Sequence, residues 1–308
     1  MVLPASGSIS MSSIRSEFGL SGQVSLSDLR NKGVLSKTPS SGPISFSDFY
    51  SKRNSELLVD LRASPYDESA MIWSWNDQST YGHVFYQDNY QHGPTYNSVG
   101  STLKYFTLDG TNDFFRSDGG ISQFQSGGVT IEAWYKPNNF KGTDGDTSQF
   151  IVNIGSTALI ADLRLQSMNS PGTTGRVTMR VGGNGGATPG QFLYAGQWYH
   201  IVGTYEVASS TSRPTKLYLN GQVRGASDYG SSAKTIESST QNYSVSIGNY
   251  HASSSSYSNS FQLRGDLGEV RIYDGCLNSG QVNINYMRTR SKYMSNGVSS
   301  DLGQVYGY

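Results

Sequence analysis

The stretch KLYLNGQVR, residues 216–224, carries the clearest local indication of the fold. Asn220 and Gly221 stand between two strand-like segments, and an Asn-Gly pair accepts the positive φ that both central positions of a tight two-residue turn require. The stretch therefore predicts a β-hairpin. On both sides of it the sequence continues as short strand-like segments, separated by turns rich in Gly, Asn, Ser and Asp.

Ten or more such segments lie between residues 56 and 290 and leave almost no room for crossover helices. In VTIEAWYK, residues 129–136, apolar and polar side chains alternate with the period of a strand that has two different faces. A short helix is expected at about residues 279–287. We therefore predict an all-β protein in which two antiparallel sheets are stacked face to face as a sandwich.

The composition restricts the classes of function. The 308 residues include 23 basic and 23 acidic side chains without basic clusters, so binding to nucleic acid is not expected. Cys276 is the only cysteine, which excludes an intramolecular disulfide and fits assembly in a reducing cytoplasm. The N-terminus lacks the features of a signal peptide, and no apolar run would span a bilayer. We expect a soluble protein without membrane insertion.

The segment of residues 1–55 contains the pattern Gly-x-apolar-Ser-apolar-Ser-polar-apolar three times. The pattern predicts a short extended piece with its apolar side chains on one face, followed by a helical turn that the second serine caps. Such small units rarely bury an apolar face alone, so we expect them to fold only against a partner: the sandwich, a sister chain or another protein. The repeats begin at Gly7, Gly22 and Gly42, and their second serines are Ser12, Ser27 and Ser47.

The run LPASGSISMSSIRSEFG, residues 3–19, resembles the opening of structural proteins of tailed bacteriophages, especially those that infect cyanobacteria. The resemblance covers the repeat-containing segment. It implies a virion protein that is assembled in the host cytoplasm and attached to other virion proteins through residues 1–55.

Six pieces of the remaining chain resemble, in the same order, the laminin-G-like and concanavalin A-like jelly-roll family. The resemblance implies a jelly-roll sandwich at residues 56–290, a C-terminal tail at 291–308, and binding of carbohydrate or protein, in some members with calcium. The pieces are YFTLDGTNDFF (105–115), GGVTIEAWYKP (127–137), GQWYHIVGTYE (196–206), KLYLNGQVRG (216–225), YSVSIGNY (243–250) and GDLGEVRIYDGCLNSGQV (265–282).

No pattern of catalytic residues stands out. Sandwich glycosidases of related fold use paired carboxylates that project from one strand. Glu132 and Glu269 instead stand alone on their predicted strands, where we expect them to be structural or solvated. The four histidines form no metal-protease pair, and Cys276 has no evident histidine partner. We therefore expect no enzymatic activity.

Two pairs of aspartates are candidates for calcium, which needs several oxygen ligands close together. They are Asp109 with Asp113, and Asp144 with Asp146. Asp-Gly sequences are also common turn formers, and that interpretation is favoured here. Gly268 occupies the place where the closing motif of the resembled family often carries an acidic residue. We therefore expect no cofactor, with calcium as the less favoured alternative.

Aromatic side chains are the best candidates for ligand binding. Sugar rings stack on Tyr and Trp while Asn, Asp and Gln bond their hydroxyl groups, and residues 81–92 and 249–257 combine these types in predicted loops. The alternative is that these aromatics pack against the sandwich or a sister subunit. The candidate residues are Tyr86, Tyr90, Tyr250 and His251.

The sequence therefore favours a non-enzymatic virion protein, a tail fibre or fibre-like protein that binds host-surface glycan through its sandwich. We expect a homo-oligomer, taken as a trimer. Two alternatives remain open. The first is a purely structural decoration or cement protein of the head or tail, and the second, weaker one is a glycan-cleaving spike.

Overall fold

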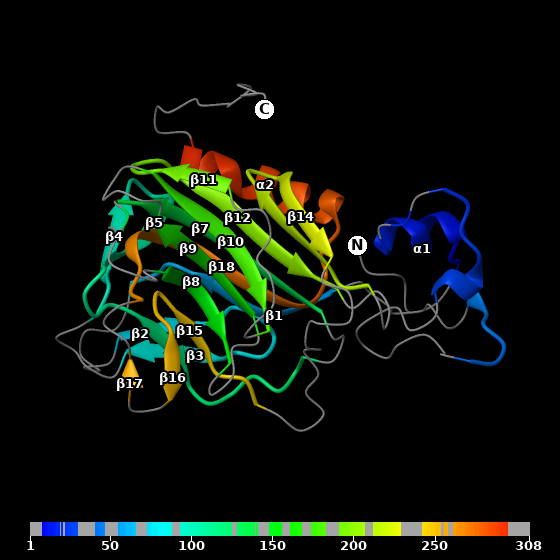
Figure 1. The fold of residues 1–308 in the computed structure, drawn as a ribbon, viewed down its shortest axis with the longest axis horizontal. Coiled ribbons are helices and arrows are strands. Elements are labelled where there is room, and N and C mark those ends of the chain that lie inside the picture. Colours follow the sequence, from blue (N-terminus) through cyan, green and yellow to red (C-terminus); the bar gives the residue numbers. More distant parts are fainter. Residues whose placement is uncertain are drawn as a thin grey trace.

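The chain forms a sandwich of two antiparallel sheets, which confirms the predicted fold class (Figure 1). A short helix on the N-terminal side and a longer one near the C-terminus accompany the sheets. The computed structural model describes residues 8–18, 20, 22–29, 41–46, 55–65, 73–87, 93–124, 128–138, 140, 148–155, 161–167, 174–182, 191–206, 212–228, 242–253, 256–257 and 261–294.

One sheet, sheet A, has eight strands. They are β1 (Ser55–Arg62), β4 (Thr95–Val99), β5 (Leu103–Asp109), β7 (Val129–Pro137), β12 (Tyr199–Tyr205), β13 (Pro214–Leu219), β14 (Gln222–Asp228) and β18 (Arg264–Gly275). Their order is β14-β13-β12-β7-β18-β5-β4, and β1 pairs with β18. The predicted hairpin joins β13 to β14, and Asn220 and Gly221 have φ values of 50° and 78°, as the tight turn requires.

The other sheet, sheet B, also has eight strands. They are β2 (Trp73–Asn76), β3 (Val84–Gln87), β6 (Phe115–Ser117), β8 (Ser148–Ile154), β9 (Ala161–Ser167), β10 (Thr174–Val181), β11 (Gln191–Tyr194) and β15 (Val245–Ile247), in the order β11-β10-β9-β8-β15-β6-β3-β2. A separate hairpin pairs β16 (His251–Ser253) with β17 (Ser256–Tyr257).

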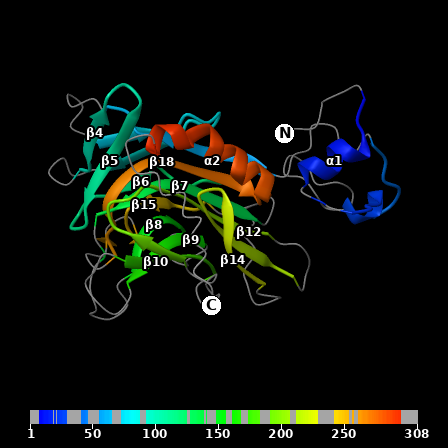
Figure 2. The ribbon, with the colours of Figure 1, turned by 90° about the horizontal axis from the view of Figure 1, so that it is seen from above.

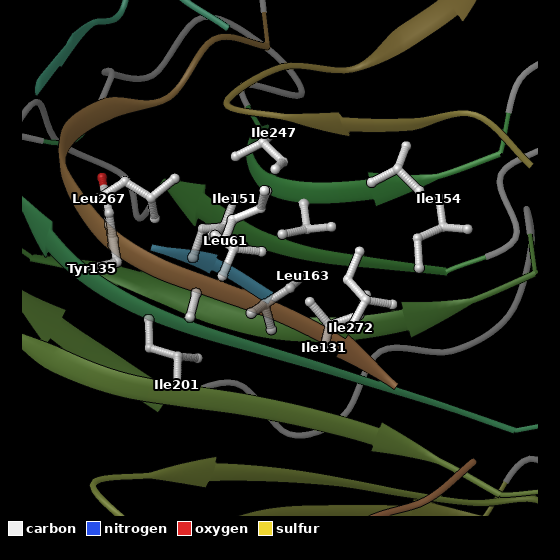
Figure 3. Close-up of a cluster of buried hydrophobic side chains, with 14 of the residues drawn as sticks. Leu61, Ile131, Tyr135, Ile151, Ile154, Leu163, Ile201, Ile247, Leu267 and Ile272 are labelled. Atoms are coloured by element: carbon white, nitrogen blue, oxygen red, sulfur yellow. The ribbon is translucent and has the colours of Figure 1, made fainter. Parts of the chain in front are cut away.

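The main core lies between the inner faces of the two sheets. Side chains from sheet A, such as Ile131 and Ile272, point toward side chains from sheet B, such as Ile151 and Leu163 (Figure 3). Alternate residues of each strand enter this core, because successive side chains of a strand point to opposite faces. The remaining residues of each strand point to the outer faces of the two sheets.

The outer face of sheet A is covered by α2 (Ser279–Met294). Figure 2 shows this helix on one side of β18 and β7, with β8, β9 and β10 on the opposite side. The expected helix at residues 279–287 is present but continues to Met294, into the segment expected as the tail, because Tyr293 packs against sheet A. Sheet A is therefore covered on both faces at its centre.

The apolar positions of the N-terminal repeats pack against one another beside the sandwich. The first repeat leads into α1 (Met11–Glu17), and the second forms a short 3-10 helix at Leu26–Leu29. The repeats thus bury part of their apolar surface against one another. The cluster consists of Ile14, Phe18 and Leu29, with Ile9, Met11, Leu20, Val24, Leu26 and Ile44 partly buried around them.

In the first repeat the first serine of the pattern caps the helix, so the prediction that the second serine caps it was wrong there; in the second repeat, the second serine, Ser27, lies inside the 3-10 helix. Ser10 caps α1 by accepting a hydrogen bond from the main-chain N–H of Ser13 (3.1 Å). In the second repeat, the N–H and hydroxyl of Ser25 both donate to the carboxylate of Asp28 (2.8 and 2.7 Å). The apolar residue between the two serines, Met11 or Leu26, is the first residue of the helix and packs at the edge of the cluster.

Candidate functional site

The candidate site is the outer face of sheet B, where one transverse row of outward-facing side chains crosses seven strands. In antiparallel pairs, residues opposite each other point to the same face. Their chain neighbours, such as Trp75 and Phe85, enter the core. The row consists of Ser74, Tyr86, Arg116, Ser246, Asn153, Asp162 and Arg180.

Tyr86, a predicted ligand-binding residue, lies in this row. It belongs to strand β3 and not to a loop, because its main chain pairs with Ser74 and Arg116 on either side. The guanidinium of Arg116 lies 4.7 Å from the centre of the half-buried Tyr86 ring, close enough for a cation–π interaction. Tyr90 lies outside the described residues.

Tyr250, another predicted ligand-binding residue, lies in an aromatic cluster and not in the transverse row. Its ring packs against Phe150 and Phe261 with centroid distances of 5.3 and 5.8 Å, and Arg164 lies 4.5 Å from the Phe150 centroid. His251 begins β16 and pairs with Tyr257 through the main chain. For Tyr250 the packing alternative therefore describes the contacts better than an open loop.

The middle of the row is buried. Asp162 and Asn153 have no exposed surface, and Arg164 donates to both carboxylate oxygens of Asp162, with 2.6 Å for the Nη2–Oδ2 bond. Burial raises the pKa of Asp162, although Arg164 and Arg180 act in the opposite direction. Neither side-chain heteroatom of Asn153 has a hydrogen-bond partner among the described residues.

An exposed aromatic pair lies at the opposite edge of the sheet, on β11, and the sequence did not reveal it. Phe192 and Tyr194 are 49% and 47% exposed, whereas Leu193 between them is buried in the core. The guanidinium of Arg176 on β10 lies 5.8 Å from the Phe192 centroid. An alternation of aromatic and aliphatic residues over 192–194 is the signal for this pair, but the pattern alone does not indicate which face is exposed.

Asp109 and Asp113 form a turn, as the favoured interpretation predicts. Asp109 Oδ1 accepts hydrogen bonds from the N–H groups of Thr111 and Asn112 (2.7 and 3.2 Å), and Asp113 accepts one from the N–H of Asp109 (2.8 Å). Burial is the main cause that raises the pKa of Asp113 to about 7, and the charge of Asp109 acts in the same direction.

Metal ligands are not gathered elsewhere in the described part of the chain. No group of three or more His, Cys, Asp or Glu side chains that could hold a metal occurs among those residues. Asp144 and Asp146 lie outside them. Among the described helices, none is long and apolar enough to cross a membrane.

Glu132 and Glu269 meet in a buried network on the outer face of sheet A, beneath α2. Arg271 donates to Glu132 (2.7 Å), Glu269 (2.5 Å) and Asp60 (3.1 Å). His200 Nε2 lies 3.1 Å from Glu132. Both glutamates are therefore structural and ion-paired. From the sequence, either a structural or a solvated position was expected for them.

Two side chains of α2 close this network. Asn285 donates to Glu132 (2.8 Å) and Lys292 to Glu269 (2.6 Å). Burial raises the pKa of Glu132, but the hydrogen bond and charge of His200 and the charge of Arg271 outweigh it and lower that pKa to about 2. These carboxylates are already satisfied by protein groups and have little access to a substrate.

Comparison with known proteins identifies the sandwich. The family model described as the concanavalin A-like lectin/glucanases superfamily matches residues 109–283. No curated protein sequence matches the chain. Several solved structures are similar to it, all with low sequence identity.

The receptor-binding domain of botulinum neurotoxin type G is 13% identical, with a TM-score of 0.47; the match covers 76% of this chain and 51% of that one, about half its length. The SAP-like pentraxin from Limulus polyphemus is 13% identical, with coverages of 62% and 78% and a TM-score of 0.42. Domain 4 of AbnA, an extracellular arabinanase from Geobacillus stearothermophilus solved with arabinotriose, is 18% identical, with coverages of 75% and 98% and a TM-score of 0.47.

Proposed function

The chain belongs to the concanavalin A-like lectin/glucanases superfamily, and we propose that it is a non-enzymatic carbohydrate-binding protein whose binding surface is the outer face of sheet B. The observation that carries the proposal is the pairing of accessible aromatic rings with guanidinium groups on this face. Tyr86 lies beside Arg116 at one end, and Phe192 lies beside Arg176 at the other. Aromatic faces stack on sugar rings, and guanidinium groups donate hydrogen bonds to sugar oxygens.

The outer face of sheet A is less suited to a ligand. Its centre is occupied by α2, whose Tyr293 ring stacks on Trp134 with a centroid distance of 4.5 Å. Trp134 at the centre of that face therefore already has a stacking partner within the protein. Of the two outer faces, the face of sheet B is the one that carries strongly exposed aromatic rings among the described residues.

The absence of catalysis, as part of the proposal, is supported by the state of the carboxylates. A glycosidase needs one carboxyl group as an acid and a second one as a nucleophile or base, both in contact with the bond that breaks. Glu132 and Glu269 are buried and bonded to Arg271. A pKa of about 2 also makes Glu132 a poor general acid near neutral pH.

We assign this carbohydrate-binding protein to a bacteriophage virion, where it adsorbs to host-surface glycan as a fibre-like homo-oligomer. The resemblance of residues 3–19 to phage structural proteins supports the assignment, together with a repeat-containing unit that has its own apolar cluster beside the sandwich. A purely structural decoration protein is the alternative. A chain that joins the particle but binds no glycan would favour that alternative.

Binding of the full chain to host-envelope polysaccharide tests the proposed surface. Replacing Tyr86 or Phe192 with Ala should weaken binding about tenfold, because each change removes a stacking surface at the cost of about 1.4 kcal/mol. Val223→Ala is the matched control, since Val223 is 47% exposed on β14 of sheet A. Unchanged affinity in both sheet B variants would contradict the proposed surface.

A further inference from the structure

The outer face of sheet B carries an excess of positive charge, although the chain has equal numbers of basic and acidic residues. Among the described strand residues that point outward from this sheet, four are arginines and one, Asp162, is a carboxylate. Arg164 is bonded to Asp162, and the charge of Arg180 also acts on this carboxylate. The other two outward guanidinium groups belong to Arg116 and Arg176, so basic side chains outnumber the single carboxylate on these strands.

Phe192 and Tyr194 form an exposed aromatic platform at the β11 edge of this face. Residues two apart in a strand are separated by about 6.6 Å, so the two rings lie one after the other along β11. Leu193 is anchored in the core between them and holds both rings on the outward side. The N–H of Tyr194 donates to the hydroxyl of Tyr199 (3.0 Å), which fixes the end of the strand. The platform is therefore preorganised.

Strand β10 places hydrogen-bonding groups beside this platform. Arg176 lies over Phe192, and its Nε atom is buried without a hydrogen-bond partner among the described residues. Thr178, the next outward residue, is 1% exposed, and its hydroxyl also has no partner there. Buried polar atoms without partners are uncommon, because each loses the hydrogen bonds it made in water. Thr178 is covered by the protein, whereas Arg176 is only partly buried, so the Arg176 guanidinium group can donate to a ligand rich in acceptor atoms.

We infer that the ligand is an anionic polysaccharide that runs across β10 and β11. Its sugar rings stack on Phe192 and Tyr194, and its carboxylate or sulfate groups bond Arg176 and approach Arg180. The planar guanidinium group suits this role because its parallel N–H donors match the two oxygens of an anionic group. The inference rests on the proposed carbohydrate-binding function and adds the charge of the ligand and the position of its site.

Titration calorimetry on the full chain with four polymers tests the inference. Polygalacturonate carries carboxylates, dextran sulfate carries sulfates, dextran is neutral, and single-stranded DNA represents the other class of polymer that combines rings with negative charge. We expect at least one acidic polysaccharide to bind about tenfold or more tightly than dextran and DNA, and the carboxylate and sulfate arms identify the anionic group. Its affinity should fall as the salt concentration rises, because salt screens the charges.

Three variants locate the site. Arg176→Gln and Phe192→Ala should each weaken binding of the acidic polysaccharide about tenfold. Arg288→Gln removes the same charge from the exposed part of α2 and should leave the affinity unchanged. Circular dichroism spectra like that of the unmodified chain show that each variant is folded.

The outcomes separate this inference from the function on which it rests. Equal affinity for dextran and the acidic polymers, or equal losses in Arg176→Gln and Arg288→Gln, would overturn the inference and leave carbohydrate binding in place. Tighter binding of DNA than of either acidic polysaccharide would overturn it in favour of a nucleic-acid ligand. Failure of all three polysaccharides, and of host-envelope polysaccharide, would overturn the proposed function as well.

Discussion

Trp134 of β7 and Tyr293 of α2 stack with their ring centroids 4.5 Å apart and an interplanar angle of 17°. The indole N–H of Trp134 also donates to the hydroxyl of Thr289 (2.8 Å). The two contacts attach the C-terminal half of α2 to sheet A. Gly268 of β18 lies directly beneath, where a Cβ atom would come within 2.3 Å of the Tyr293 ring. The helix and the sheet are therefore fitted to each other closely.

Replacing Tyr293 with Ala should lower the free energy of unfolding by about 3 kcal/mol, because a buried aromatic ring is lost and a cavity remains. Chemical denaturation measures the change. Met287→Ala is the control on the same helix, since Met287 is 48% exposed and its loss should change stability by less than about 0.5 kcal/mol. Similar losses in the two variants would show that α2 is not fastened by Tyr293.

The network beneath α2 predicts a loss of stability in acid. The pKa of Glu132 is lowered from 4.5 to about 2 in the folded protein. Its contribution is therefore present above about pH 4.5 and disappears as the pH falls toward 2, with a total of about 3 kcal/mol. Glu132→Gln should be less stable than the unmodified chain at pH 6, and the difference should shrink in this window. A constant difference from pH 6 to pH 2 would contradict the assignment.

The sequence predicts those parts of the fold that depend on neighbouring residues. Asn220-Gly221 specifies a turn by its own conformational preferences, and the alternation over 129–136 specifies a strand with two faces. Whether the second face of such a strand is buried does not depend on neighbouring residues. Glu132 faces α2, whose Asn285 is distant in the chain, and alternation alone does not distinguish a polar face covered by a helix from a solvated one.

The candidate site is less predictable for the same reason. Tyr86 was expected in a loop because its strand partners, Ser74 and Arg116, come from segments that are short and weakly patterned. Phe192 and Tyr194 were not predicted from the sequence. Their alternation with Leu193 is the pattern of any strand with one buried face, and it does not show which face is buried. The transverse row on sheet B forms only when seven strands pair in the correct register, so the composition of any one segment could not reveal it.

The raised pKa of Asp113 predicts a change of stability with pH that is opposite in sign to the change predicted for Glu132. Its pKa is raised from 3.8 to about 7, so the folded state favours the protonated carboxyl. Stability from this group is present below about pH 4 and is lost as the pH rises through 7. Asp113→Asn should therefore become more stable relative to the unmodified chain as the pH rises from 4 to 8, as measured by thermal melting. A relative stability that falls over this range would contradict the raised pKa.

Calcium should have no effect at the Asp109–Asp113 turn, because these carboxylates accept hydrogen bonds from the main chain of the turn itself. The melting temperature of the full chain should be the same in excess calcium chloride and in excess EDTA. If calcium raises the melting temperature, Asp109→Asn distinguishes the sites. A rise that this variant abolishes would place the ion at the turn after all.

The proposed absence of catalysis predicts that the purified chain releases no new reducing ends from host-envelope polysaccharide. Glu132 and Glu269 are ion-paired beneath α2, so these two carboxylates are not placed as acid and nucleophile beside a bound sugar. Steady release that disappears in Glu132→Gln or Glu269→Gln would show a glycan-cleaving enzyme. Release that persists unchanged in both variants would place catalysis elsewhere on the chain, and either result would reject the non-enzymatic proposal.

The N-terminal repeats predict an anchor that can be disabled without unfolding the sandwich. Ile14 is fully buried in the repeat cluster and takes no part in the core between the sheets, so Ile14→Asp should disrupt the cluster through an unpaired buried charge. The full chain with this change should keep its main melting transition and its glycan affinity but fail to join phage particles. Phe46→Asp is the control, because Phe46 is 41% exposed and belongs to the third repeat. Normal incorporation of the Ile14→Asp chain would show that the repeat cluster is not the anchor.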